Sequence, residues 1–246
     1  MQLLRAFLLV AGRGKRLKPL TDKTPKCLLP IHGAPLLQIW LEHLEISGVD
    51  EVLINTHWLH EMVEEFVTEW SSLHNKIKII LFHEPGLLGS AGTILANRQW
   101  AGQHPFFIIY GDNLTQFDLQ KMLAFHRKGG QPLTIRVYRE ADPSRAGIVC
   151  IDANGIVTDF EEKPVYPKSD FGAGGIYVAD ERIFDFFPDQ DERPGDAIFD
   201  LSYHVLPRMR GKMMAYDSGE FSIDIGTPAA YEKAKRIWPG NMAADR

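Results

Sequence analysis

Residues 9–30, LVAGRGKRLKPLTDKTPKCLLP, decide the fold of this chain. An apolar run over residues 6–10 predicts a strand, which breaks at Gly12 and Gly14. The cations in and after the break are Arg13, Lys15, Arg16, Lys18 and Lys26. Glycines let backbone N–H groups approach a ligand closely, and cations beside them complement a polyanion. Such a loop after the first strand of an α/β sheet predicts a phosphate site, and a basic surface turn is the alternative.

Two common phosphate motifs do not describe this loop. The dinucleotide fingerprint needs a third glycine at the position that Leu17 occupies. The P-loop ends in Gly-Lys-Ser/Thr, whereas Gly14-Lys15 is followed by Arg16. The loop therefore belongs to neither class.

Apolar strand-like runs alternate with amphipathic helical runs, which predicts an α/β fold with a three-layer, mostly parallel sheet flanked by helices. The predicted strands are residues 6–10, 51–55, 76–82, 106–110 and 133–138. The predicted helices are residues 36–47, stopped by Gly48, then 60–70, 117–127 and one beginning near Gly89.

The second half of the chain is richer in short strands. We expect a hairpin of residues 148–151 and 156–160, a strand over 175–179 and a helix over 199–209. With 246 residues, 45% of them apolar, the chain is long enough for a large core. We predict one domain over residues 1–232, with a nucleotide lobe over about 1–130, a sugar lobe over 131–232 and a tail over 233–246.

The basic loop carries a longer signature, G-x-G-x-R-L-x-P-L-T followed by P-K-x-L-L-P. This signature resembles that of the sugar-1-phosphate nucleotidylyltransferases. Within that family, the chain is most similar in general character to short enzymes of the mannose-1-phosphate guanylyltransferase type. The resemblance implies a Rossmann-like nucleotide-diphosphosugar transferase fold with a smaller β-rich sugar lobe. It also implies an NTP and a sugar 1-phosphate as substrates. Lys15 stands where the family usually has threonine.

Two aspartates are candidate metal ligands. Asp112 follows an apolar strand in FIIYGDN, where a hard carboxylate suits Mg²⁺, although a helix cap is the alternative. Asp224 lies in the apolar run FSIDIGTPAAY, where an unpaired carboxylate would be costly. Both segments resemble metal motifs of the family, so we expect Mg²⁺ as the cofactor. Thr227 and Pro228 are expected to begin the closing helix as N-cap and first residue.

A base-binding segment is predicted in HEPGLLGSAGT, which resembles the family's L-G-T-A-G. Gly89 and Gly92 would let a flat base lie against the backbone, and close helix–sheet packing is the alternative. Glu84 would accept hydrogen bonds from the N–H edge of guanine, or would be a solvated loop acid.

A sugar-phosphate segment is predicted in FEEKP, which resembles the family's F-x-E-K-P. Lys163 offers a compact cation to the phosphate and Glu162 an acceptor to sugar hydroxyls, although alone they read as an exposed charge cluster. Gly147, before this segment, and Gly175, after it, are the other predicted sugar-phosphate-binding residues. Ala173 replaces the family's asparagine, which removes one expected sugar contact.

The resemblance also implies which residues bind the triphosphate and which act in catalysis. The triphosphate would be bound by Ala11, Gly12, Gly14, Lys15 and Arg16. The catalytic set would be Arg16, Lys26, Asp112 and Lys163, with Lys26 neutralising charge at the α-phosphate. A glycosyltransferase that uses nucleotide sugars is one alternative, although such enzymes typically carry Asp-x-Asp where this chain has Gly-Asp-Asn. A non-catalytic regulator that binds NDP-sugar is another.

The composition limits which binding partners and which cellular location can be expected for this protein. The formal net charge of −5 gives no case for nucleic acid or a membrane surface, and the first apolar run is too short for a membrane span. We therefore expect a cytoplasmic enzyme, and the sequence is compatible with a homo-oligomer. Cys27 and Cys150 receive no role. His57 and His60 lack the glutamate and third ligand of a helical zinc motif and are expected to be surface or helix-start residues.

Overall fold

The computed structural model describes residues 3–193, 195, 198–217, 219 and 221–240. The chain divides into two compact units. Unit 1 consists of Met1–Leu87, Ile109–Asp118 and Glu220–Arg246, and unit 2 of Leu88–Ile108 and Leu119–Gly219. Residues 241–246 of the predicted tail lie outside the described residues, and the lobe boundaries stay a prediction.

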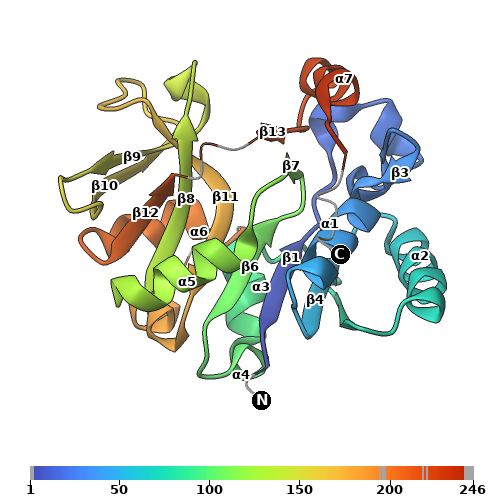
Figure 1. Ribbon diagram of the computed structural model, residues 1–246, viewed down its shortest axis with the longest axis horizontal. Helices are drawn as coiled ribbons and strands as arrows, with labels where there is room; N and C mark the ends of the chain where they lie inside the picture. Colours follow the sequence, from blue (N-terminus) through green and yellow to red (C-terminus); the bar gives the residue numbers. More distant parts are fainter. Residues whose placement is uncertain (1–2, 194, 196–197, 218, 220, 241–246) are drawn as a thin grey trace. The chain divides into compact units, whose positions relative to one another are not determined.

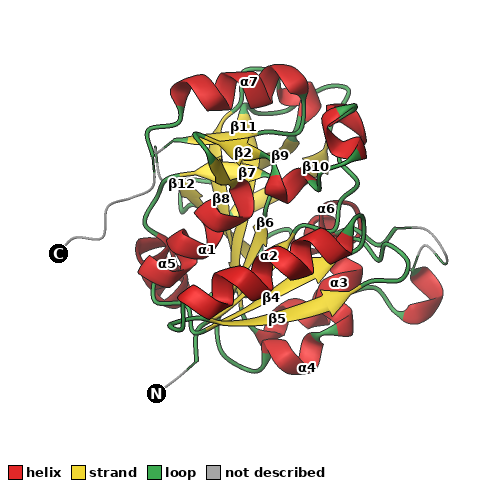
Figure 2. Cartoon of the chain, turned by 90° about the vertical axis from the view of Figure 1, so that its right-hand side faces the viewer, coloured by secondary structure: helices red, strands yellow, loops and turns green. Residues whose placement is uncertain are grey.

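Unit 1 is built on parallel strands. The strands β1 (Arg5–Leu9), β4 (Glu51–Thr56) and β5 (Lys78–His83) pair in that order, and all three run parallel. Every residue of β4 is buried, as expected for a strand covered on both faces. The helices α1 (Leu36–Ile46) and α2 (His60–Leu73) flank these strands, and Figure 2 shows α2 lying along β4 and β5.

Two predicted helix boundaries of unit 1 are confirmed, the stop at Gly48 and the start at Thr227. After α1, Gly48 has a φ of 70°, a left-handed conformation that glycine adopts without penalty. The closing helix α7 (Pro228–Ile237) begins with proline, and the Thr227 hydroxyl accepts a hydrogen bond from Ala230 N at 3.2 Å. The cap therefore fixes where the chain turns after Asp224.

Two short antiparallel pairs complete unit 1. One joins β2 (Pro30–Ile31) to β3 (Ala34–Pro35). The other joins β7 (Asn113–Thr115) to β13 (Ser222–Asp224), with Asp224 opposite Asn113. The strand β6 (Phe106–Tyr110) enters unit 1 with its last two residues, and Gly111 N donates to Leu9 O at 3.0 Å just beyond it. These contacts bring the segments after β1, β6 and β13 together.

The strands of unit 2 are five to nine residues long (Figure 1), so the short strands predicted for the second half of the chain are longer than expected. Its strands are β8 (Leu133–Arg139), β9 (Gly147–Ile151), β10 (Val157–Glu162), β11 (Phe171–Ala179) and β12 (Met213–Asp217). β9 and β10 form the predicted hairpin, β11 pairs antiparallel with β8 and β9, and β12 pairs parallel with β8. Its helices are α3 (Ser90–Ala96), α4 (Arg98–Ala101), α5 (Leu119–Gly129) and α6 (Leu201–His204).

The predicted α/β class is confirmed, and one predicted element is wrong. The helix expected over residues 199–209 is divided into α6 and a 3₁₀ turn over Leu206–Met209. Pro207 explains the division, because it has no N–H to donate and its ring clashes with the preceding helical turn. Within the described residues, no helix has the length and apolarity that a membrane span requires.

Candidate active site

The glycine-rich loop of unit 1 is a tight turn closed on Gly14. Gly14 has a φ of 60°, and its carbonyl accepts hydrogen bonds from Leu17 N at 2.8 Å and from the Thr21 hydroxyl at 2.9 Å. A Cβ at Gly14 would lie 2.7 Å from Thr21 Cγ2, so no larger residue fits. Leu17 is fully buried and anchors the turn, while Lys15 and Arg16 beside it are exposed.

The buried side-chain amide of Asn55 links this loop to the neighbouring strands by hydrogen bonds. Asn55, at 4% exposure, accepts at Oδ1 from Val10 N (2.7 Å) and Ala11 N (3.4 Å). Its Nδ2 donates to Glu84 Oε1 at 2.8 Å, and Glu84 is fully buried. Glu84 therefore acts on the loop through Asn55 in this structure, and its contact with a guanine edge stays a prediction. Asn55 lies near the end of β4 and in no motif, so its role could not be predicted from the sequence.

The segment before α2 also contacts the loop. Trp58 Nε1 donates to Thr21 O at 3.0 Å, and Arg13 Nη2 lies 3.3 Å from His57 Nε2. His57 Nδ1 lies 2.8 Å from Glu84 O. Because a guanidinium only donates and a carbonyl only accepts, these contacts require the neutral Nδ1–H tautomer of His57. His57 thus bridges the loop and the end of β5.

The candidate catalytic residues of unit 1 converge on one ammonium group. Lys26 Nζ lies 2.7 Å from Asp112 Oδ2 and 3.8 Å from Asp224 Oδ1. Lys26 follows the loop in a short 3₁₀ turn (Lys26–Leu28), Asp112 follows β6, and Asp224 ends β13. Arg16 adds a second cation, since its Nη2 would lie only 2.7 Å from a Cβ at Gly226. The structure therefore brings together four residues that are distant in the sequence.

The two carboxylates are unequally neutralised. Burial and the neighbouring charge of Asp112 raise the pKa of Asp224, although Lys26 and the 2.6 Å hydrogen bond from Gly226 N oppose the rise. Burial also acts to raise the pKa of Asp112, but the charge and hydrogen bond of Lys26 outweigh it, so that pKa is lowered. The carboxylates remain 37% and 53% exposed. Two accessible carboxylates that share one ammonium fit a divalent cation such as Mg²⁺.

Gly147, Glu162 and Lys163 of the predicted sugar-phosphate set lie together at the β9–β10 hairpin of unit 2. Gly147 is opposite Glu162, and a Cβ at Gly147 would lie 2.8 Å from Glu162 Oε2. Lys163 Nζ is 3.2 Å from Glu162 Oε1 and its side chain is 54% exposed. Lys163 has a φ of 50° and donates its backbone N–H to Ala146 O at 3.0 Å. A left-handed conformation is uncommon for lysine and is often found at functional sites.

The other three predicted site glycines, Gly89, Gly92 and Gly175, lie in unit 2. Gly175 is buried in an irregular part of β11, where the register to β8 shifts, and has a φ of 67°. A Cβ at Gly89 would lie 2.6 Å from Phe199 O, and Gly92 N donates to Phe199 O at 3.0 Å. Gly89 and Gly92 thus pack closely against the chain before α6. Their contact with a base stays a prediction.

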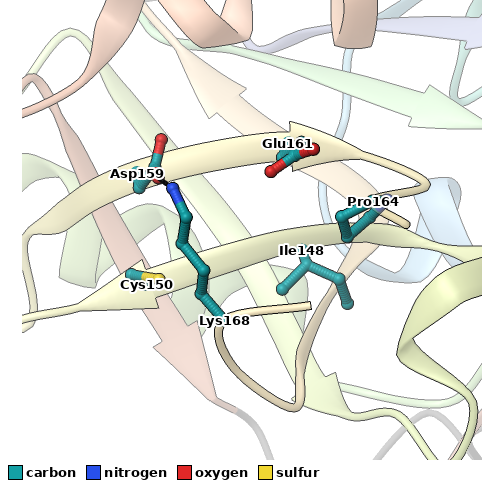
Figure 3. Close-up of a pocket in the computed structure, with 6 residues that line it drawn as sticks. All are labelled: Ile148, Cys150, Asp159, Glu161, Pro164 and Lys168. Atoms are coloured by element: carbon teal, nitrogen blue, oxygen red, sulfur yellow. Dashed lines mark hydrogen bonds and ion pairs between the residues drawn. The ribbon is translucent and has the colours of Figure 1, made fainter. Parts of the chain in front are cut away.

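A small pocket opens on the other face of the hairpin. It is lined by Ile148, Cys150, Asp159, Glu161, Pro164 and Lys168. Figure 3 shows Lys168 reaching Asp159, and their Nζ and Oδ2 lie 2.7 Å apart. Glu161 and Glu162 point to opposite faces because side chains alternate along a strand. The pocket is too small for a nucleotide sugar, and none of the predicted site residues lines it.

Comparison with known families agrees with this arrangement. The sequence profile of the nucleotidyl transferase family matches residues 5–238, nearly the whole chain. The chain belongs to the nucleotidyl transferase family. The resemblance to sugar-1-phosphate nucleotidylyltransferases that the loop signature carries is thereby confirmed.

Two curated relatives of this chain are guanylyltransferases by name. The catalytic subunit beta of mannose-1-phosphate guanylyltransferase from Drosophila melanogaster is 33% identical over 233 residues, which cover 91% of this chain. This chain spans 60% of that relative's length. The D-glycero-alpha-D-manno-heptose 1-phosphate guanylyltransferase from Aneurinibacillus thermoaerophilus is 29% identical, with 95% of this chain and 97% of the relative covered.

The fold of this chain also has a close counterpart among solved structures. A UDP-glucose pyrophosphorylase complexed with UDP-glucose superposes with a TM-score of 0.82. The match covers 96% of this chain and 98% of that one, at 21% sequence identity. The predicted Rossmann-like nucleotidyltransferase fold is confirmed by this likeness.

Proposed function

We propose that this chain transfers a nucleotidyl group from an NTP to a sugar 1-phosphate and releases pyrophosphate. The observation that carries the proposal is the convergence of Arg16, Lys26, Asp112 and Asp224 beside the glycine-rich loop. Such a site offers cations to a triphosphate and paired carboxylates to a metal. Family membership supports the reaction class.

The reaction joins two anions, so holding them in line and offsetting their repulsion is the main task. The loop amides of Gly12 and Gly14 and the Arg16 guanidinium would bind the triphosphate and the departing pyrophosphate. Lys26 would neutralise charge at the α-phosphate. Asp112 and Asp224 would hold Mg²⁺, which supplies charge neutralisation to the phosphates when bound.

The sugar phosphate would be bound by unit 2. Lys163 offers an exposed ammonium to the phosphate, and Glu162 beside it accepts from sugar hydroxyls. The attacking phosphate needs no general base because its second pKa, about 6, leaves it largely ionised near neutral pH. The protein's contribution is therefore positioning and electrostatic stabilisation.

For the substrates, we propose GTP with mannose 1-phosphate or another manno-configured sugar 1-phosphate. The names of the two curated relatives support guanine and the manno configuration. Uridine, cytidine, thymidine and adenosine nucleotides are the competitors. A cytoplasmic location and a homo-oligomeric state stay predictions.

The test is pyrophosphate release by the purified chain with Mg²⁺, for each of the five nucleotides paired with mannose, manno-heptose and glucose 1-phosphates. GTP with a manno-configured acceptor is expected to give the highest kcat/KM. Transfer of the sugar from an NDP-sugar without pyrophosphate chemistry would favour a glycosyltransferase. Tight NDP-sugar binding without turnover of any pair would favour a regulator.

A further inference from the structure

We propose that unit 1 carries a transition-metal site formed by His60, Glu64 and His83, separate from the Asp112–Asp224 pair. Each of the three residues offers one ligand atom, and these atoms all lie within 4.8 Å of one another. His60 is the first residue of α2, Glu64 lies one turn later, and His83 ends β5. The site therefore joins a helix to the strand along which it lies (Figure 2).

The side chains already face one another. His60 Nδ1 lies 2.9 Å from Glu64 Oε1, an i,i+4 contact on one helical face. The rings of His60 and His83 have centroids 4.2 Å apart and are tilted by 52°. Ligands of a tetrahedral zinc ion at bond lengths near 2.0 Å lie about 3.3 Å apart, so small rotations of exposed side chains close the remaining gap.

The donor set selects the class of metal. Two imidazoles and a carboxylate suit Zn²⁺, Co²⁺ or Ni²⁺, whereas Mg²⁺ and Ca²⁺ prefer oxygen ligands throughout. His60 and Glu64 are 36% and 39% exposed and His83 is exposed, so water can enter and complete the coordination. Leu59, directly before His60, has a φ of 50°, a costly conformation for leucine that orients the start of α2.

The site adjoins the network that supports the glycine-rich loop. His83 directly precedes Glu84, whose carboxylate accepts from Asn55, and Asn55 holds the Val10 amide. A metal that fixes α2 to the end of β5 would therefore stabilise the segment on which the loop depends. The expected effect is a rise in the melting temperature that grows with metal concentration.

Zinc titration by calorimetry tests the proposal, with millimolar Mg²⁺ present to occupy the aspartate pair. Wild-type protein is expected to bind one equivalent, with an affinity at least about tenfold weaker in His83→Ala and in Glu64→Gln. His104→Ala, which removes an exposed histidine of unit 2, is the matched control and should bind like wild type. Cobalt substitution should give ligand-field absorption bands that His83→Ala loses.

Thermal melts without metal establish that each variant is folded before its affinity is compared. Absence of zinc binding by wild-type protein would overturn the proposal. So would a His83→Ala protein that binds zinc as tightly as wild type. Neither result would touch the proposed nucleotidyl transfer, which is read out by pyrophosphate release and requires no residue of this cluster.

Discussion

Replacing Lys26 with alanine removes the ammonium that contacts both candidate metal ligands. The four charged groups of the site, two cations and two carboxylates, then change from balanced to a net charge of −1 before the anionic substrates enter. A unit charge about 4 Å away contributes about 4 kcal/mol at an effective dielectric constant of 20. Because the carboxylates are 37% and 53% exposed, solvent screening lowers this figure, and we expect about 2–4 kcal/mol.

That loss corresponds to a fall of roughly 30- to 1,000-fold in kcat/KM for pyrophosphate release. The Lys26 side chain is only 11% exposed, so a thermal melt should first establish that Lys26→Ala is folded. Lys18→Ala is the matched control: it removes a cation of the same loop whose side chain is 60% exposed and paired with Asp22. It should change kcat/KM by no more than about twofold. Wild-type turnover in Lys26→Ala would refute the electrostatic reasoning.

Three further perturbations test separate parts of the account. At pH 7, Asp224→Asn should keep or raise the melting temperature of the metal-free protein, because the pKa of Asp224 is raised in the folded state and its charge therefore destabilises that state at any pH above the ordinary pKa. Turnover should fall by about 100-fold or more. A lower melting temperature would contradict the first expectation. Gly147→Ala should raise KM for the sugar phosphate roughly tenfold or more and leave KM for the nucleotide unchanged, since the new Cβ would lie 2.8 Å from Glu162 Oε2; steady-state kinetics with each substrate varied decides. Burial lowers the pKa of His126 from 6.5 to about 4 in the folded protein. As the pH falls, the histidine is therefore protonated in the unfolded chain before it is protonated in the folded chain. The free energy of unfolding should fall by up to about 3 kcal/mol as pH drops from 6.5 to 4. Urea unfolding at several pH values in that range should show that the free energy of unfolding depends less steeply on pH in His126→Gln than in wild type. An unchanged pH dependence would assign the acid sensitivity to other groups.

The main strands could be predicted because each contains a run of mostly apolar residues. Phe106–Tyr110 is recovered at both ends, and its first four residues are fully buried. The short strands β7 and β13 were missed because three residues do not show a period-2 pattern. They form through a pairing between segments far apart in the chain, which local sequence does not encode.

The candidate site divides in the same way. Lys26, Asp112 and Asp224 could be nominated because each lies in a motif with its own chemistry. Their mutual distances could not, because the β7–β13 pairing and the end of β6 set them. Asn55 carries no motif signal, and its role emerges only from hydrogen bonds to Val10 and Glu84.

The histidine cluster shows the same limit. The spacing of His57 and His60 lacks the pattern of a helical zinc motif. The structure supplies the glutamate from the next turn of α2 and the second histidine from β5. A ligand from a neighbouring strand leaves no fixed spacing in the sequence.

Isotope transfer from GTP labelled at the α-phosphorus tests the central claim most directly. Incubation with mannose 1-phosphate and Mg²⁺ should move the label into the sugar nucleotide, and GTP labelled at the β- and γ-phosphates should release all of its label as pyrophosphate. Addition of pyrophosphate to the labelled sugar nucleotide should regenerate labelled GTP. Label that stays in GTP with every sugar 1-phosphate and every nucleotide tried, or that appears as GMP, would contradict nucleotidyl transfer.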